Sequence, residues 1–155
     1  MALDVSMKHI NSHCLASIFI ETTNSNPRLG DIVEICIVPL DNFIRPSRKI
    51  IPFYLQIQPF RTEAIDFKTA STTKAKILEA QNIGLEPSLV ADRLSEWVER
   101  LDLPPNKKII PLTYNWPLVR EYLVTWLGFH NFDHLFYSNE YRDILATVLY
   151  INDTC

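Results

Sequence analysis

The chain has 155 residues, 47% of them hydrophobic and 21% charged, with a formal net charge of −3 and a pI near 5.8. This length and balance predict one globular domain, residues 1–155, in which residues 1–12 form a loose arm. The apolar content is sufficient for a core without a metal or disulfide support. The acidic total argues against broad, non-specific binding of nucleic acid, because phosphate contacts require Lys and Arg.

The cysteines and the longest apolar runs indicate in which cellular compartment the chain is expected. Cys14, Cys36 and Cys155 are odd in number and form no C-x-x-C pair, which argues against a disulfide framework or a zinc knuckle. No basic segment followed by a long apolar stretch opens the chain, and its longest apolar runs are too short to span a bilayer. The sequence therefore predicts a reduced, cytoplasmic protein without membrane contact.

The first part of the chain predicts three strands in succession. The apolar run 14–20 predicts a buried central strand, and the polar stretch 21–30 predicts a turn. The β-branched run 32–40 predicts a second strand, and the alternation over 50–58 predicts a third. Pro52 favours an edge position for this third strand in an antiparallel meander.

The second part of the chain predicts helices that alternate with short strands. Apolar residues there recur at helical spacing, and Pro and Gly residues mark the ends of several segments. Helices are expected at 73–81, 87–101, 117–127 and 140–151, and strands at 108–112 and 134–137. This order predicts an α/β domain with a five-stranded mixed sheet and helices packed on it.

Four short segments resemble the motifs of one enzyme family. Residues 19–24 read Phe-Ile-Glu-Thr-Thr-Asn, and residues 31–40 read Asp-Ile-Val-Glu-Ile-Cys-Ile-Val-Pro-Leu. Residues 114–119 read Tyr-Asn-Trp-Pro-Leu-Val, and residues 141–145 read Tyr-Arg-Asp-Ile-Leu. In order and spacing they resemble the motifs of the DnaQ-like 3′–5′ exonucleases, in which D-x-E-T-T-G ends the first strand and H-N-x-x-F-D opens a later helix.

The resemblance implies an RNase H-like fold and metal-dependent hydrolysis of nucleic acid. In such a nuclease, two divalent ions about 3.5–4 Å apart activate a water and stabilise the leaving oxygen. Hard cations such as Mg²⁺ prefer oxygen ligands, so several carboxylates must converge from separate segments. The D-x-E spacing places two of these acids on one face of a strand, because side chains alternate along it.

This chain departs from the family pattern at the acidic positions. Phe19 stands at the position of the first aspartate, and Val119 stands at that of the second-motif aspartate. The resemblance leaves Glu21 as the remnant catalytic residue and metal ligand, with Asp143 as its candidate neighbour. The third motif, with a further acid and a general base, is expected beyond Asp153.

The same resemblance marks four candidate substrate-binding residues, Thr22, Thr23, Asn115 and Trp116. Each of them has a structural interpretation as well. The two threonines suit a turn, and Asn115 suits the N-cap of the helix that follows it. The Trp116 ring can stack on a base or pack against the core.

The other polar candidates also have structural alternatives. Glu21 suits a polar strand end before a turn, and Asp143 suits the first turn of a helix, where the helix dipole favours an acid. His130 and His134 would share one face of a helix and could then bind a metal. Gly128 favours a loop in that segment, so we expect solvated or capping histidines there.

Basic residues gather in two places, at Arg45, Arg48 and Lys49 and at Lys107 and Lys108. Neither cluster has the interleaved aromatic residues that are typical of nucleic-acid interfaces. Solvated turns are the simpler interpretation of both clusters.

The sequence supports two functional hypotheses. In the first, the chain is a catalytically impaired, exonuclease-like pseudoenzyme of phage-like type, without a cofactor in this form, that binds a protein partner or single-stranded nucleic acid. In the second, it is an active exonuclease that uses Mg²⁺ or Mn²⁺, and a partner chain or a further segment supplies the missing ligands. The exposed edge of the third strand is a further surface, which could form a homo-oligomer.

Overall fold

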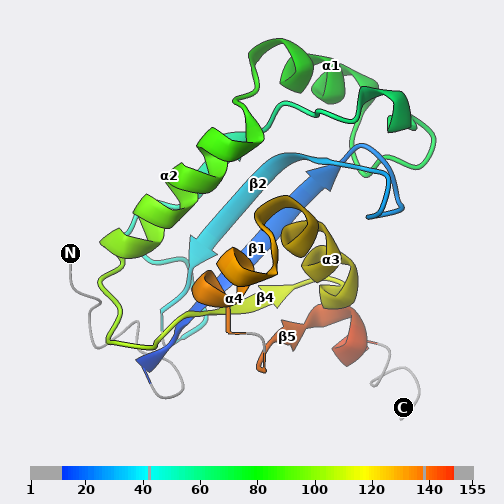
Figure 1. Ribbon diagram of the computed structural model, residues 1–155. Coiled ribbons are helices and arrows are strands. Elements are labelled where there is room, and N and C mark those ends of the chain that lie inside the picture. Colours follow the sequence, from blue (N-terminus) through cyan, green and yellow to red (C-terminus); the bar gives the residue numbers. More distant parts are fainter. Residues whose placement is uncertain (1–11, 42, 138, 149–155) are drawn as a thin grey trace.

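The computed structural model describes residues 12–41, 43–137 and 139–148. Its centre is a five-stranded sheet in the order β3-β2-β1-β4-β5 (Figure 1). The strands are β1 Cys14–Thr22, β2 Ile32–Pro39, β3 Phe53–Gln56, β4 Ile109–Thr113 and β5 Arg142–Asp143. β1, β2 and β3 form an antiparallel meander, whereas β4 is parallel to β1 and β5 is parallel to β4. The predicted mixed sheet of an α/β domain is therefore confirmed.

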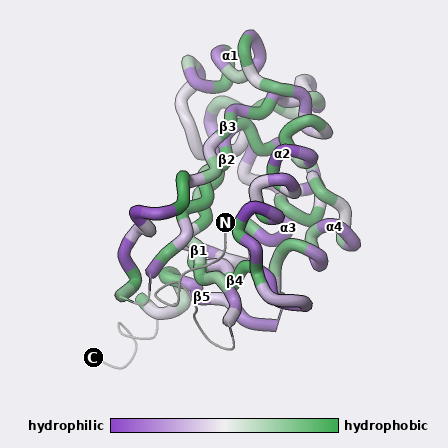
Figure 2. Tube along the Cα trace, turned by 90° about the vertical axis from the view of Figure 1, so that its left-hand side faces the viewer, coloured by the Kyte–Doolittle hydropathy of each residue, from purple (hydrophilic) through white to green (hydrophobic). Residues whose placement is uncertain are grey.

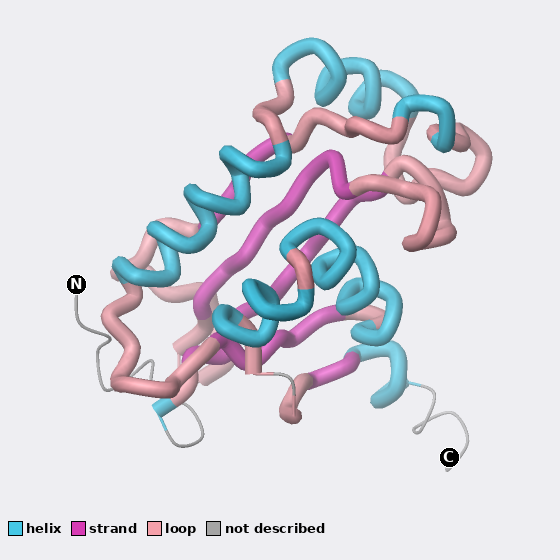
Figure 3. The backbone as a smooth tube through the Cα atoms, viewed as in Figure 1, coloured by secondary structure: helices cyan, strands magenta, loops and turns pink. Residues whose placement is uncertain are grey.

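Helices cover one face of this sheet. They are α1 Lys74–Ile83, α2 Pro87–Arg100, α3 Trp116–Leu127 and α4 Phe129–Leu135, and residues 144–148 are also helical. Figure 3 shows α2, α3 and α4 lying over the same side of the strands, while α1 lies beyond one end of the sheet. Hydrophobic residues run along the strands, and hydrophilic residues recur along the helices (Figure 2).

The register of the sheet explains why its two faces differ. Residues that are paired across strands share a face, and neighbours along a strand alternate between faces. Ile18 and Ile37 pair, and both are buried in the main core beneath the helices. Phe19 pairs with Cys36, which pairs with Tyr54, so these three side chains lie on the opposite face. That face bears large side chains that remain partly exposed.

Local sequence features account for the predicted helices that are confirmed. α2 begins at Pro87, whose fixed φ and missing N–H suit a first helical turn. Val90, Leu94 and Trp97 recur at helical spacing and are its buried residues. α1 begins after Thr73, whose side-chain oxygen accepts a hydrogen bond from the backbone N–H of Lys76.

Two predicted strand ends are corrected. β1 continues through Glu21 to Thr22, because Glu21 pairs with Glu34 and Thr22 pairs with Ile32 after a local irregularity. β3 is shorter than the predicted 50–58, but it does form an edge of the sheet, as Pro52 suggested. The first two residues of the E-T-T motif thus belong to the strand and not to the turn.

The predictions for the last third of the chain were partly wrong. The segment around His130, predicted as a loop, is the helix α4, and the predicted strand 134–137 is not formed. Phe136 makes only an isolated bridge to Ile109, and Arg142–Asp143 forms the fifth strand. The predicted helix 140–151 begins only at residue 144, and its part beyond residue 148 lies outside the described residues.

Burial also sets the state of the cysteines. Cys14 is fully buried and free, and burial raises the pKa of its thiol to about 12. Cys36 is free and half-buried, and burial raises the pKa of its thiol as well. Cys155 and most of the predicted arm lie outside the described residues. Within the described ranges, no helix has the length and apolarity needed to cross a membrane.

Candidate functional site

The carboxyl end of β1 carries the first candidate residues. Phe19 and Glu21 lie on the open face of the sheet, and 53% of Phe19 is exposed. The Ser71 hydroxyl donates a hydrogen bond to Glu21 Oε2 at 2.5 Å and accepts one from the Thr22 N–H at 2.8 Å. Ser71 thus ties the loop before α1 to this end of β1. The Glu21 carboxylate remains partly accessible beside an exposed aromatic ring.

The two threonines of the motif have structural partners. The Thr22 hydroxyl donates to the Asn24 carbonyl at 3.1 Å, and the Thr23 hydroxyl accepts from the Asp31 N–H at 2.9 Å. Thr22 and Thr23 are both buried. The Tyr122 hydroxyl also donates to the Asn24 carbonyl, and burial raises the pKa of Tyr122. These hydroxyl groups therefore fix the turn after β1 and do not line a surface.

The second-motif residues lie in or near the core. Trp116 is 2% exposed, and its ring stacks with those of Phe132 and Tyr141 at centroid distances of 6.1 and 5.9 Å. Val119 is buried in the main core with it. The interpretation of Trp116 as a core residue fits this position, since the ring leaves almost no surface on which a base could stack.

Asp143 acts as a shared cap for two helices. Its carboxylate accepts hydrogen bonds from the N–H groups of Asn115 and Trp116 at 3.0 and 2.9 Å, and from the N–H of Leu145 at 3.0 Å. Asn115 occupies the N-cap position of α3, as predicted, but its side chain makes no capping bond and its backbone is left-handed, with φ of 60°. Asp143 thus supplies the cap that the sequence assigned to Asn115, and it does so from β5 and not from a helix.

Glu21 and Asp143 do not converge. Glu21 pairs with Glu34 on the open face, where Lys76 Nζ of α1 lies 3.9 Å from Glu34 Oε1. Asp143 pairs with Thr113 of β4, so these two side chains share a face of the sheet. Leu112 lies on the open face, so its neighbour Thr113 lies on the other face, where its hydroxyl donates to the Ile18 carbonyl. Asp143 therefore points to the helix-covered face, so the sheet separates the two carboxylates.

The described residues hold no group of three or more His, Cys, Asp and Glu side chains that could bind a metal ion. A pair of divalent ions needs several converging carboxylates, and Glu21 with the neutral Ser71 hydroxyl does not fit that requirement. His130 and His134 do lie on a helix, contrary to the predicted loop, and both are exposed.

The Asp31–Arg61 pair is a structural feature that the sequence did not reveal. Asp31 accepts hydrogen bonds from the Phe60 and Arg61 N–H groups at 3.0 and 2.7 Å, and Arg61 Nε lies 2.9 Å from Asp31 Oδ1. The Arg61 guanidinium also donates to the carbonyls of Arg28 and Gly30. Asp31 is thus an anchor for the segment after β3, and these partners are about 30 residues away along the chain, so no local pattern predicts them.

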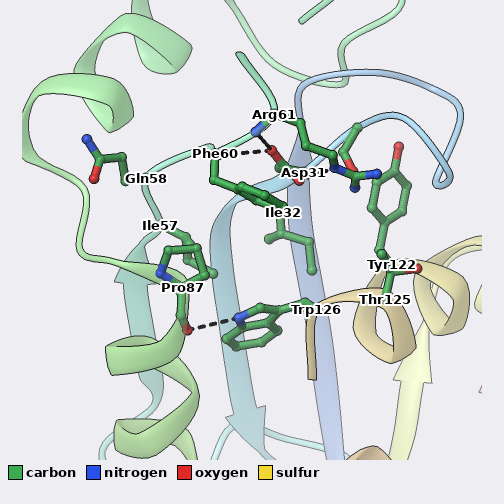
Figure 4. A pocket seen from close by; sticks show the side chains of 11 residues that line it. Asp31, Ile32, Ile57, Gln58, Phe60, Arg61, Pro87, Tyr122, Thr125 and Trp126 are labelled. Atoms are coloured by element: carbon green, nitrogen blue, oxygen red, sulfur yellow. Dashed lines mark hydrogen bonds and ion pairs between the residues drawn. The ribbon is translucent and has the colours of Figure 1, made fainter. Parts of the chain in front are cut away.

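A small cavity lies beside this anchor, between the start of β2, the start of α2 and α3. Its volume is about 100 Å³, and Figure 4 shows Asp31 and Arg61 at one rim and Trp126 at the other. Trp126 Nε1 donates to the Pro87 carbonyl at 3.0 Å, which closes that side. Ligand pockets usually measure about 300–1,000 Å³, so this cavity is too small for a nucleotide.

Comparisons with known proteins identify the fold. No family model and no curated protein match the chain. Among solved structures, exonuclease I from Methylocaldum szegediense is 18% identical with a TM-score of 0.60, over 88% of this chain and 28% of that one. A product-bound exonuclease I is 15% identical with a TM-score of 0.61, over 88% and 31%. E. coli exonuclease I in complex with a dT13 oligonucleotide is 14% identical with a TM-score of 0.58, over 88% and 29%.

The chain thus spans less than a third of the length of these structures. At such low identity the likeness establishes the arrangement of the elements and not a shared activity. The predicted fold is confirmed on this evidence: the chain has the RNase H-like fold of the exonuclease I structures.

Proposed function

We propose that this chain is a non-catalytic binding module for single-stranded nucleic acid, built on an exonuclease-type fold. The observation that carries the proposal is the pair at the end of β1: a half-exposed Phe19 beside the remaining Glu21. An aromatic ring can stack on a base, whereas it cannot bind a metal ion. At this position the Phe19 ring thus offers a surface for a base in place of a carboxylate for a metal ion.

The surroundings of Val119 and Asp143 support the loss of hydrolysis. Val119 is packed in the core, and the Asp143 carboxylate is used by backbone N–H groups on the other face of the sheet. The solved structures that share the fold include exonuclease I bound to an oligonucleotide, which supports single-stranded nucleic acid as the ligand class.

Fluorescence anisotropy with a labelled single-stranded oligonucleotide tests the binding. Stacking contributes about 1–3 kcal/mol per base, so we expect Phe19→Ala to weaken binding roughly tenfold. Phe129→Ala is the matched control, because Phe129 is a comparably exposed phenylalanine at the start of α4, away from the open face. Equal affinities of both variants and the unmodified chain would contradict the proposal.

A further inference from the structure

A groove runs along the outer edge of β3, and we call it the β3 groove. Its walls include Tyr54 and Leu55 of β3 and Arg93, Glu96, Trp97 and Arg100 of α2, and its volume is about 350 Å³. The α2 residues recur at spacings of three and four, so one face of the helix forms the wall. Figure 1 shows α2 lying along this side of the sheet.

The backbone of β3 is open toward this groove. Ile57 donates to the Val33 carbonyl, so residues 57, 55 and 53 bond to β2, and Tyr54 and Gln56 point their backbone groups outward. Leu85 donates to the outward Gln56 carbonyl at 3.1 Å. No bond from another described segment reaches the N–H and carbonyl of Tyr54 or the N–H of Gln56. An added strand would therefore find three backbone groups ready to pair.

An apolar cavity continues the groove beyond Trp97. It measures about 400 Å³ and is lined by Ile50, Ile51 and Leu101, together with Trp97 and Arg100, which it shares with the β3 groove. Trp97 Nε1 donates to the Ile51 carbonyl at 2.9 Å, which fixes the indole as a rigid floor. Ile51 is 83% exposed. This cavity suits an apolar side chain of a bound segment.

The rim of the groove is basic, although the chain as a whole is acidic. Arg93 and Arg100 flank it, Lys49 lines the apolar extension, and Glu96 is the acidic residue among the lining side chains. The Arg100–Glu96 pair is long, at 3.9 Å, and both side chains are largely exposed, so it holds Arg100 weakly. The rim thus favours an acidic partner.

We propose that the β3 groove binds an extended segment of a partner protein in which acidic residues flank an apolar residue. The segment would add to the sheet as a strand next to β3, place its apolar side chain beside Trp97 and Ile51, and pair its acids with Arg93 and Arg100. The strand supplies affinity through the backbone, and the alternate side chains supply selectivity.

Other occupants fit less well. A second copy of this chain would bring its own Arg93 and Arg100 against the same residues, and like charges oppose that pairing. A nucleic-acid backbone could neutralise the arginines, but it would leave the outward N–H and carbonyl of Tyr54 and the apolar cavity without partners. The combination of open backbone, apolar cavity and basic rim is the observation that selects a peptide.

Anisotropy of a fluorescent nine-residue peptide of alternating Asp and Leu, added to the full chain, tests the proposal. We expect saturable binding that Arg93→Glu with Arg100→Glu weakens at least tenfold, while Lys68→Glu, a charge reversal on another exposed lysine, leaves it unchanged. A peptide with Lys in place of Asp should not bind. Thermal unfolding of each variant establishes that the fold is intact.

Amide hydrogen exchange identifies the mode of binding. Bound peptide should slow exchange at the N–H groups of Tyr54 and Gln56. Absence of saturable binding, unchanged affinity in the double reversal, or unprotected amides with bound peptide would each overturn the proposal. A dimer of the chain in size-exclusion chromatography without peptide would do so as well. The same holds for an oligonucleotide that binds at Arg93 and Arg100 while the peptide does not. Oligonucleotide binding at Phe19 is independent of these arginines, so the two proposals can fail separately.

Discussion

The two faces of the sheet use their side chains differently. The helix-covered face pairs Ile18 with Ile37, and both are buried in a continuous apolar core. On the open face, Phe19 and Tyr54 flank Cys36 and remain more than half exposed. The same strands supply both sets, because neighbouring side chains alternate between the faces and the helices pack on only one of them. The covered face therefore holds the main core, whereas the open face combines a smaller buried apolar cluster with exposed side chains that can contact a ligand.

The largest expected effect separates the two faces by stability. Ile35→Ala removes a fully buried core side chain and should lower the free energy of unfolding by about 2–5 kcal/mol. Phe19→Ala should cost about 1 kcal/mol or less, because its ring is half exposed. Urea denaturation of both variants measures the difference. Similar losses would show that the open face belongs to the core.

The next effect concerns the acid on the covered face. Asp143→Ala leaves the first N–H groups of α3 without their partner, so we expect a loss of about 1–2 kcal/mol in the free energy of unfolding. Asp143→Asn should lose less, because its amide oxygen still accepts. Asp92→Ala, which removes an exposed acid of α2, is the control and should stay within about 0.5 kcal/mol.

Metal titrations of the same variants distinguish a helix cap from a metal ligand at Asp143. If Asp143→Ala kept its stability and instead abolished Mn²⁺ binding, Asp143 would be a ligand and not a cap.

The smallest effect lies just before β1, at the opposite end from Phe19. His13 is buried, its Nδ1 accepts from the Lys108 N–H at 3.0 Å, and its ring lies 4.4 Å from that of Tyr137. Burial, and then the charge of Lys107, lowers the pKa of His13 from its ordinary 6.5. As the pH falls, His13 therefore binds a proton in the unfolded chain before it does so in the folded chain. The stability that the neutral ring contributes is present above pH 6.5 and is lost as the pH falls below it.

Denaturation experiments between pH 7 and pH 5 measure this contribution of His13 to the free energy of unfolding. The free energy of unfolding should fall more steeply for the unmodified chain than for His13→Gln, whose side chain does not titrate. Parallel pH profiles would show that His13 is not held neutral by the fold.

The sequence predicted the helices and strands well where periodicity and local chemistry agree. α2 combines Pro87 with a regular apolar stripe, and both signals mark the same helix. The segment after Gly128 was mispredicted because a glycine with φ of 78° ends α3 and also precedes α4 directly. A single left-handed residue can turn the chain between two helices, whereas the sequence alone indicates only that the first helix ends.

The candidate site was less predictable than the fold, because its chemistry depends on contacts across the chain. The family resemblance assigns Phe19, Glu21 and Val119 to motif positions, and their roles there stay predictions. The cap that Asp143 provides to α3, 27 residues away, could not be predicted, since it depends on β5 lying beside β4. The same holds for Asp31, whose partner Arg61 follows β3.

One measurement tests the central claim directly: an end-labelled single strand is incubated with the chain in Mg²⁺ or Mn²⁺, and binding and nucleotide release are followed in the same sample. We predict that the strand binds and remains intact, and that Glu21→Ala changes neither the length of the strand nor its release of nucleotides. Metal-dependent shortening from the 3′ end that Glu21→Ala abolishes would contradict this prediction, and would identify an active exonuclease whose further ligands come from elsewhere.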